Sequence, residues 1–263
     1  MPHGWLIGCA VTDGCCGSSA PGEFAAGEFA AGGSSGGRWR SRHLLCLAAL
    51  ERTFILKRHD ALAAAAGPAL LHALRTEAPG VRLRFLAEAS TDTYDPRRGD
   101  IDLEAGSSEP SSPEMRHEVV GHDRLILALR AAHPLCRAPL TLEKYAAAEH
   151  ITVSRRGRLR DPIDDALESQ GMSRQVVAAT PTNATALQFV RHHDLVAAVP
   201  QLISRPLLDD LGLHTRPLPL TMPTIPIHLA WHQRYDNDPA HAWLRGQVRT
   251  ALHHACNPTD DAT

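Results

Sequence analysis

The pattern of apolar and polar positions in residues 175–202 predicts a strand, a helix and a second strand in succession. Residues 175–179 are a short apolar run with the β-branched content of a buried strand. Residues 180–183 (TPTN) supply hydroxyl and amide acceptors for a helix start, where proline is tolerated. Residues 195–199 are a second buried-strand candidate, which ends at Pro200. Because a βαβ unit brings helix N-termini and loops to the carboxyl edge of a sheet, we expect a ligand site here rather than a catalytic one.

The same alternation continues through the rest of the chain. Residues 81–86 alternate at period two, as a half-buried strand does, and residues 61–78 predict a helix broken or kinked near Gly67-Pro68. Residues 239–254 predict a final helix with Asp238 as its N-cap. Further strands are expected at residues 54–56, 99–103, 125–129, 151–153, 218–220 and 227–231, and further helices at 140–148 and 162–170. Alternating strands and helices predict the α/β class with mainly parallel sheets.

Residues 1–50 do not have the composition of a folded domain. Gly, Ala and Ser dominate residues 17–37, which contain the direct repeat GEFAA at 22–26 and 27–31. Such a segment buries too little apolar surface to offset the entropy lost on ordering it. We therefore predict a low-complexity, disordered N-terminus over residues 1–50.

Charge and cysteine usage narrow the classes of function. The chain has 27 Lys and Arg against 29 Asp and Glu, so its net charge of −2 gives no basic field for nonspecific nucleic-acid binding. The six cysteines have no C-x-x-C and no regular spacing, which favours reduced thiols over disulfides or a zinc site. No run approaches the roughly 20 apolar residues of a membrane span, and the N-terminus lacks the basic and apolar regions of a secretion signal. We expect a cytoplasmic protein that uses no metal or cofactor and contacts no membrane.

A set of short segments along the chain carries a family resemblance. These segments are residues 67–71 (GPALL), 78–83 (APGVRL), 99–103 (GDIDL), 133–135 (HPL), 166–171 (ALESQG), 194–200 (DLVAAVP), 231–232 (WH) and 238–245 (DPAHAWLR). In their order and spacing, residues 52 to about 250 resemble the effector-binding, or substrate-binding, domain of LysR-type transcriptional regulators. The resemblance implies the two-lobed α/β fold of type II periplasmic solute-binding proteins, with a small effector in a cleft that the chain crosses twice.

The first fifty residues depart from the pattern of that family. Its members carry an N-terminal winged helix-turn-helix and a long dimerising linker helix, and residues 1–50 contain no such pattern beyond a short apolar run at 43–50. We therefore expect a regulator that lacks its DNA-binding part, and no DNA binding by this chain alone. The expected organisation is residues 51–128 plus 227–256 in lobe I, residues 129–226 in lobe II, and residues 257–263 as a tail.

The resemblance places the effector contacts in the loops that follow strands of both lobes. In lobe I these are His59, Asp60, Glu88 and Ser90, and in lobe II they are Ser154, Arg155, Thr182 and Asn183, with Pro200 as a wall. Amides at the helix start near Thr182 are suited to hold a carboxylate, and Arg155 is suited to pair with it through two hydrogen bonds. A small carboxylate is therefore the effector chemistry that we expect.

Several of these residues also have a purely structural interpretation. Thr182 has the residue type of a plain helix cap, and His59 with Asp60 has the pattern of a pair that caps the following helix. Arg155 belongs to the segment SRRGR, which is also typical of a solvated basic loop. The sequence alone leaves both interpretations open.

The leading functional hypothesis is a non-catalytic ligand sensor that binds a small effector between its lobes and pairs with a second copy of itself. A solute-binding protein of a transporter shares the fold but requires secretion. An enzyme on the same two-lobe fold would have to use His59, Asp60 and Glu88, although no nucleophile, base and orienting group stand at a recognisable spacing. A decayed gene product without a working pocket is the remaining alternative.

Overall fold

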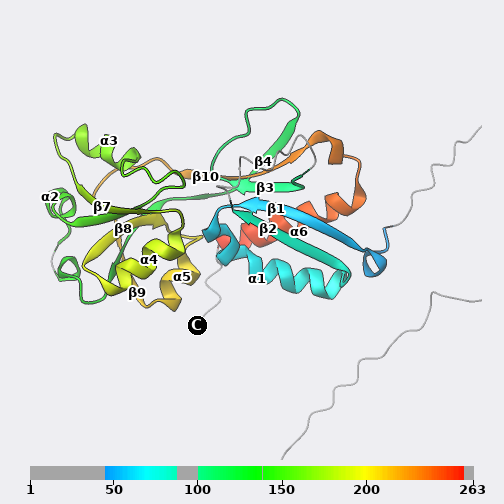
Figure 1. Cartoon of the computed structure of the whole chain (residues 1–263), viewed down its shortest axis with the longest axis horizontal. Coiled ribbons are helices and arrows are strands. Elements are labelled where there is room, and N and C mark those ends of the chain that lie inside the picture. The colour runs from blue at the N-terminus through cyan, green and yellow to red at the C-terminus, as the bar shows by residue number, and fades with distance from the viewer. Residues whose placement is uncertain (1–44, 88–99, 138, 258–263) are drawn as a thin grey trace, which may run out of the picture. The chain divides into compact units, whose positions relative to one another are not determined.

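The computed structural model describes residues 45–87, 100–137 and 139–257, which form two five-stranded sheets (Figure 1). Most of the predicted disordered N-terminus and nearly all of the predicted tail lie outside the described residues. Short 3₁₀ helices occur at Leu47–Ala49, Pro134–Cys136 and Gln233–Tyr235.

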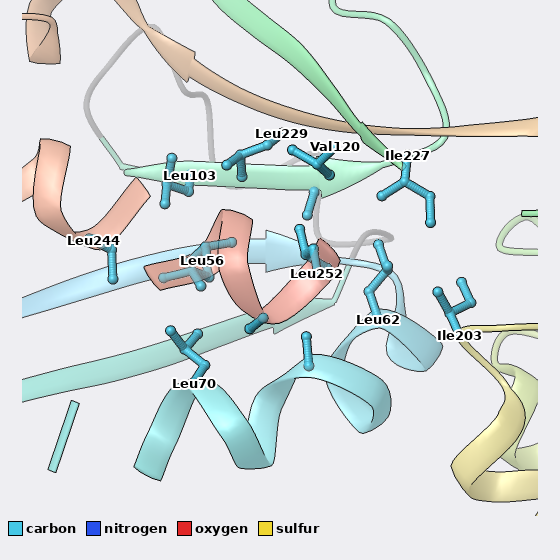
Figure 2. Close-up of a cluster of buried hydrophobic side chains, with 14 of the residues drawn as sticks. Leu56, Leu62, Leu70, Leu103, Val120, Ile203, Ile227, Leu229, Leu244 and Leu252 are labelled. Atoms are coloured by element: carbon cyan, nitrogen blue, oxygen red, sulfur yellow. The ribbon is translucent and has the colours of Figure 1, made fainter. Parts of the chain in front are cut away.

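The first lobe is built on the sheet with strand order β2-β1-β3-β10-β4. Its strands are β1 (Arg52–Arg58), β2 (Val81–Ala87), β3 (Leu103–Gly106), β4 (Met115–Asp123) and β10 (Ile225–His232), and its helices are α1 (Asp60–Glu77) and α6 (Pro239–Cys256). Both helices contribute to one apolar cluster with the inward residues of β1, β3 and β10 (Figure 2). The two helices therefore cover the same face of this sheet.

Helix α1 runs through Gly67-Pro68 as one continuous helix, so the break that was one of the two expectations there is wrong. Leu62, Ala66, Leu70 and Leu74 recur at a spacing of four and are all buried, which gives the helix a continuous apolar stripe. Pro68 is exposed, on the side away from that stripe. Proline removes one backbone hydrogen bond there, and we attribute the continuity of the helix to burial of the stripe against the sheet.

The second lobe is built on the sheet with strand order β7-β6-β8-β5-β9. Its strands are β5 (Leu125–Arg130), β6 (Glu149–Val153), β7 (Gln175–Thr180), β8 (Leu195–Pro200) and β9 (Leu213–Pro217), and its helices are α2 (Leu142–Ala146), α3 (Pro162–Glu168), α4 (Asn183–His192) and α5 (Arg205–Asp210). The strand, helix and strand predicted in residues 175–202 are confirmed as β7, α4 and β8. The strand predicted at 218–220 is wrong. The strand that pairs with β5 lies just before those residues, as β9, and is an edge strand with exposed polar residues.

Both sheets are mixed, although the sequence predicted mainly parallel ones. Strands β1, β2 and β3 pair in parallel in the first lobe, as do β6, β7 and β8 in the second. The other half of the strand pairings in the described chain are antiparallel, and all of them involve β10 or β5. These two strands follow the points where the chain enters a lobe from the other one, so their direction is set by the crossings. The α/β class and the two-lobed fold are confirmed.

The chain crosses between the sheets twice, after Asp123 and between Pro217 and Ile225. Since Leu125–Arg130 belongs to the second sheet, we place the first crossing at Arg124, a few residues before the boundary predicted after residue 128. The second crossing ends at Ile225, close to the predicted residue 227.

The Asp123 carboxylate joins the lobes at the first crossing. It is 3% exposed and accepts hydrogen bonds from the backbone amides of Leu202 (3.0 Å) and Ile203 (3.0 Å), which belong to the second lobe. The Arg124 amide donates a further hydrogen bond to it at 2.7 Å. Ile203 in turn packs into the apolar cluster of the first lobe, beside Leu62 of α1 (Figure 2). One buried carboxylate thus fixes the segment that inserts Ile203 into the other lobe.

Replacing Asp123 by Asn is expected to lower the free energy of unfolding by about 1–3 kcal/mol, because asparagine lacks the charge and one of the two acceptor oxygens that the three backbone amides use. Urea unfolding followed by circular dichroism measures the change. Asp210→Asn, at an exposed position on α5, is the matched control and is expected to change stability by less than about 0.5 kcal/mol. Equal stability of the Asp123→Asn and Asp210→Asn variants would contradict this role.

Candidate functional site

A cavity of about 480 Å³ lies where the two sheets approach each other, and both lobes line it. The first lobe contributes His59, just before α1, and Ser107, just after β3. The second lobe contributes Thr152 from β6, Asn183 from α4 and Pro200 from β8. Leu125, Val153, Ala198, Met222 and Ile225 add apolar surface. Most of these residues lie at strand ends or helix starts, where an α/β sheet holds its ligands.

A smaller cavity of about 200 Å³ shares His59 and Arg155 with the larger one. Arg58, Asp60, Phe85 and the strand end at Leu86-Ala87 line it from the first lobe, and Pro181 and Thr182 line it from the second. Both lobes therefore contribute basic side chains to this smaller cavity.

The N-termini of α1 and α4 contact each other beside the two cavities. The Asp60 carboxylate accepts a hydrogen bond from the Ala184 amide at 3.1 Å, so a side chain of the first lobe caps a helix of the second. The side-chain amide of Asn183, which is 1% exposed, lies 3.5 Å from Nδ1 of His59. A carboxylate at a helix N-terminus is favoured by the helix dipole, which gives this contact both a hydrogen bond and an electrostatic component.

Local capping accounts for part of the predicted site. Thr182 is the N-cap of α4, and its hydroxyl accepts from the Thr185 amide at 3.2 Å. His59 is the N-cap of α1, and its Nδ1 accepts from the Ala61 amide at 3.4 Å. Ser154 accepts from the Arg158 amide at 2.8 Å and so stabilises the loop after β6. The structural interpretation of Thr182 and His59 is thus present, and both residues line a cavity as well.

The predicted site residues fall into three groups in the structure. His59, Asp60, Arg155, Thr182, Asn183 and Pro200 line one or both cavities. Ser154 directly precedes Arg155 but does not line either cavity. Glu88 and Ser90 lie outside the described residues. Whether any of them contacts an effector stays a prediction.

Thr152 and Asp161 line the larger cavity and were not predicted. The Thr152 hydroxyl donates to the Asp161 carboxylate at 2.6 Å, and Asp161 is the N-cap of α3, where it forms a capping box with Asp164. Arg174, whose side chain is 1% exposed, pairs with Asp161 at 2.8 Å and with Asp164 at 2.9 Å. The sequence D-P-x-D at 161–164 is a capping-box signal from which Asp161 could have been identified. Thr152 could not, because the direction of its side chain depends on how β6 pairs in the sheet.

The charged guanidinium of Arg174 fixes Asp161 and Asp164 at this wall of the cavity. Burial alone disfavours its charge, but the hydrogen bonds and the charges of Asp164 and Asp161 outweigh that effect and raise the Arg174 pKa above its ordinary value. The same hydrogen bonds lower the pKa of Asp164 against the opposing effect of its burial. Thr152 therefore faces the cavity with its hydroxyl hydrogen directed to a fixed carboxylate and its oxygen available as an acceptor.

The arrangement of two lobes around such a cavity is that of effector-binding and solute-binding domains, and comparison with known proteins specifies which. The chain belongs to the LysR substrate-binding domain family, whose model matches residues 56–253. It is 29% identical to the HTH-type transcriptional activator NagR of a Ralstonia species over 198 residues, covering 75% of this chain and 66% of that protein. It is 27% identical to the HTH-type transcriptional activator NahR of Pseudomonas putida, covering 74% of this chain and 65% of that protein.

Solved structures show the same fold. The probable transcriptional regulator PA0477 from Pseudomonas aeruginosa superposes with a TM-score of 0.68 at 29% identity, covering 78% of this chain and 68% of that one. The regulatory domain of MexT, a transcriptional activator in the same organism, superposes with a TM-score of 0.64 at 26% identity, covering 76% of this chain and 97% of that domain. The chain is thus similar to nearly all of a regulatory domain, but spans about two thirds of the curated full-length relatives.

Neither a solute-binding protein of a transporter nor an enzyme finds support in these relatives, which are transcriptional regulators. Among the helices that the structure describes, none combines the length and the apolar composition that crossing a membrane requires.

Replacing Asp60 by Ala is expected to remove the cap that the first lobe provides to α4. Loss of a carboxylate cap costs about 1 kcal/mol, so the amides at the start of α4 should exchange several times faster in the variant. Hydrogen–deuterium exchange of peptides covering residues 181–190 measures this effect. The exposed Asp210→Ala variant is the control, and equal exchange in both variants would show that Asp60 does not cap α4 in solution.

Proposed function

We propose that this chain is the ligand-sensing part of a LysR-type transcriptional regulator and that it binds a small-molecule effector in the cavity of about 480 Å³. The observation that supports this most directly is the lining of the cavity by both lobes. Its volume lies within the roughly 300–1,000 Å³ that is usual for small-molecule sites. An effector there would contact His59 and Ser107 of one lobe and Thr152 and Asn183 of the other.

A small carboxylate suits the chemistry of the lining. Arg155 supplies a cation at the edge of the cavity, and Asn183 supplies a side-chain amide. The Thr152 oxygen is an acceptor for a hydroxyl group elsewhere on the ligand. The walls formed by Pro200, Met222 and their neighbours suit an apolar or ring-shaped body. The effector-binding domain of QuiR, which shares the fold at 16% identity, is solved in complex with shikimate.

Binding would act on the arrangement of the lobes rather than on a chemical bond. A ligand that contacts both lobes stabilises the arrangement in which it fits best, by the difference between its affinities for the available arrangements. His59 and Asp60 lie 3.3 Å apart, as an acid–base pair does. However, Nδ1 of His59 accepts from Ala61, and Asp60 accepts from Ala184. We therefore infer ligand sensing without catalysis.

The effector proposal is tested by a thermal-shift and calorimetric screen of small aliphatic and aromatic carboxylates against their neutral amides. A carboxylate that binds the unmodified chain is expected to bind at least about tenfold more weakly to Met222→Trp, because the indole fills the cavity. Leu159→Trp adds the same side chain at a position 54% exposed and outside the cavity, and should bind normally.

Two results would contradict the effector proposal. One is unchanged affinity in Met222→Trp, which would place the ligand elsewhere. The other is chemical conversion of the bound ligand during a long incubation, as detected by nuclear magnetic resonance. Such conversion would favour an enzyme. A complete absence of ligands would favour a pocket without function.

We further propose that the partner of this chain is a second copy and that DNA is bound only through a segment other than the described residues. Strands β2 and β7 are edge strands, each with one side that has no partner strand among the described residues. Exposed apolar side chains lie on β7 itself (Val177, 43% exposed) and on the helices next to these strands in the chain, α1 (Leu71, 50%) and α4 (Phe189, 44%). Exposed edges of this kind favour pairing with another chain.

A dimer would be detected by sedimentation equilibrium as twice the mass of the 28.5 kDa chain. Val177→Lys, which puts a charge on edge strand β7, is expected to weaken self-association by about tenfold or more. Val119→Lys, at a position 49% exposed on β4, is the matched control. Monomers at all concentrations, or equal weakening by both variants, would contradict dimerisation through this edge.

A further inference from the structure

Arg174 lies just before β7 and lines neither of the two cavities. Its side chain is 1% exposed and bridges two carboxylates, reaching Asp161 at 2.8 Å and both oxygens of Asp164 at 2.9 Å. Asp161 also accepts the hydroxyl hydrogen of Thr152 at 2.6 Å, on the same oxygen that Arg174 contacts. A series of contacts therefore connects a buried guanidinium to a hydroxyl at the wall of the larger cavity.

The start of α3 also holds both aspartates in place. The second oxygen of Asp161 accepts from the Ile163 amide at 2.7 Å, and Asp164 accepts from the Asp161 amide at 2.8 Å. Neither carboxylate can turn away from Arg174 without losing part of the capping box. Thr152 has one hydroxyl hydrogen, and donating it to Asp161 leaves only the lone pairs of its oxygen to face the cavity.

Two buried titratable neighbours of this cluster are neutral at neutral pH. Tyr145 is fully buried, and burial raises its pKa to about 12 against the opposing effect of the Arg174 charge. His150 is also fully buried, with its ring centre 4.7 Å from that of Tyr145, and burial lowers its pKa to about 4. The charge that balances the two carboxylates is therefore that of Arg174.

Without that charge, Asp161 and Asp164 would share a proton, because like charges held close together raise the pKa of one of them. A protonated Asp161 would donate to Thr152 and turn the hydroxyl hydrogen of Thr152 toward the cavity. We propose that Arg174 is a positioning residue that keeps Thr152 an acceptor, so that this wall selects ligands that present a hydrogen-bond donor to β6. The selection of ligands rests on the effector function proposed above, whereas the orientation of Thr152 does not.

The orientation of Thr152 is tested without a ligand, by the exchange of its hydroxyl proton with water in nuclear magnetic resonance spectra. This proton is buried and bonded to a carboxylate, so we expect slow exchange in the unmodified chain and in Arg174→Lys, which keeps the charge. In Arg174→Met the exchange should be at least about tenfold faster, because the hydrogen turns toward the cavity. Arg160→Met is the matched control, since Arg160 pairs with Asp165 of the same helix at an exposed position.

The selection of ligands is tested with cyclohexanol and cyclohexanone, which have rings of the same size but differ in the donor. Their affinities are measured from the shifts of the methyl resonances of Val153 and Met222, which line the cavity. Cyclohexanol is expected to bind the unmodified chain about tenfold more tightly, because the ketone places an acceptor against an acceptor. Thr152→Val, Asp161→Asn and Arg174→Met should abolish this preference, whereas Arg174→Lys should retain it.

Breaking a buried ion pair is destabilising, so Asp161→Asn provides a second variant should Arg174→Met fold poorly. Asparagine keeps an oxygen for the Ile163 amide and turns an N–H toward Thr152. A slowly exchanging Thr152 hydroxyl and an unchanged preference for cyclohexanol in both variants would overturn the proposal. Equal binding of the two probes by the unmodified chain, or binding of neither, would overturn it as well. Equal binding that Met222→Trp abolishes would leave the effector cavity standing without the role of Arg174.

Discussion

The hydrogen bonds that the Asp123 carboxylate accepts from three backbone amides are the constraint on which the two-lobed arrangement depends. Asp123 ends β4 in the first sheet, and its acceptors hold the segment that follows β8 in the second. That segment delivers Ile203 into the apolar cluster between α1 and the first sheet. A carboxylate buried in this way is stable only because its oxygens are satisfied by fixed donors. The cavities lie between the lobes, so their shape depends on this junction.

Local sequence patterns were sufficient for the elements that need only their own residues. The cap at Asp238 is confirmed, as is the strand, helix and strand of residues 175–202, because capping and burial are encoded within a few positions. The antiparallel half of each sheet was not predictable in this way. Strand β10 pairs with β3 and β4 across more than a hundred residues of chain, and no local pattern records that partner.

The candidate site shows the same division. His59, Arg155 and Asn183 come together because each follows a strand or starts a helix at the carboxyl edge of a parallel group, which the alternation of elements predicts. Arg58 and Thr152 were missed because both belong to strands, where the side that faces a cavity depends on the register with neighbouring strands. The backbone periodicity therefore locates the edge of the sheets, whereas their pairing decides which side chains line it.

The contact between Asp60 and the Ala184 amide has a consequence for ligand selectivity. The chain already supplies its own carboxylate to the start of α4, and Thr182 occupies the Thr185 amide. A carboxylate ligand that relied on those amides would have to displace a tethered group whose effective concentration is far above that of any free metabolite. Ligands recognised through arginine and through the apolar walls do not face that competition. Asp60 would thus disfavour acids that depend on the amides at the start of α4, and would leave the pocket to ligands held by arginine or by the apolar walls.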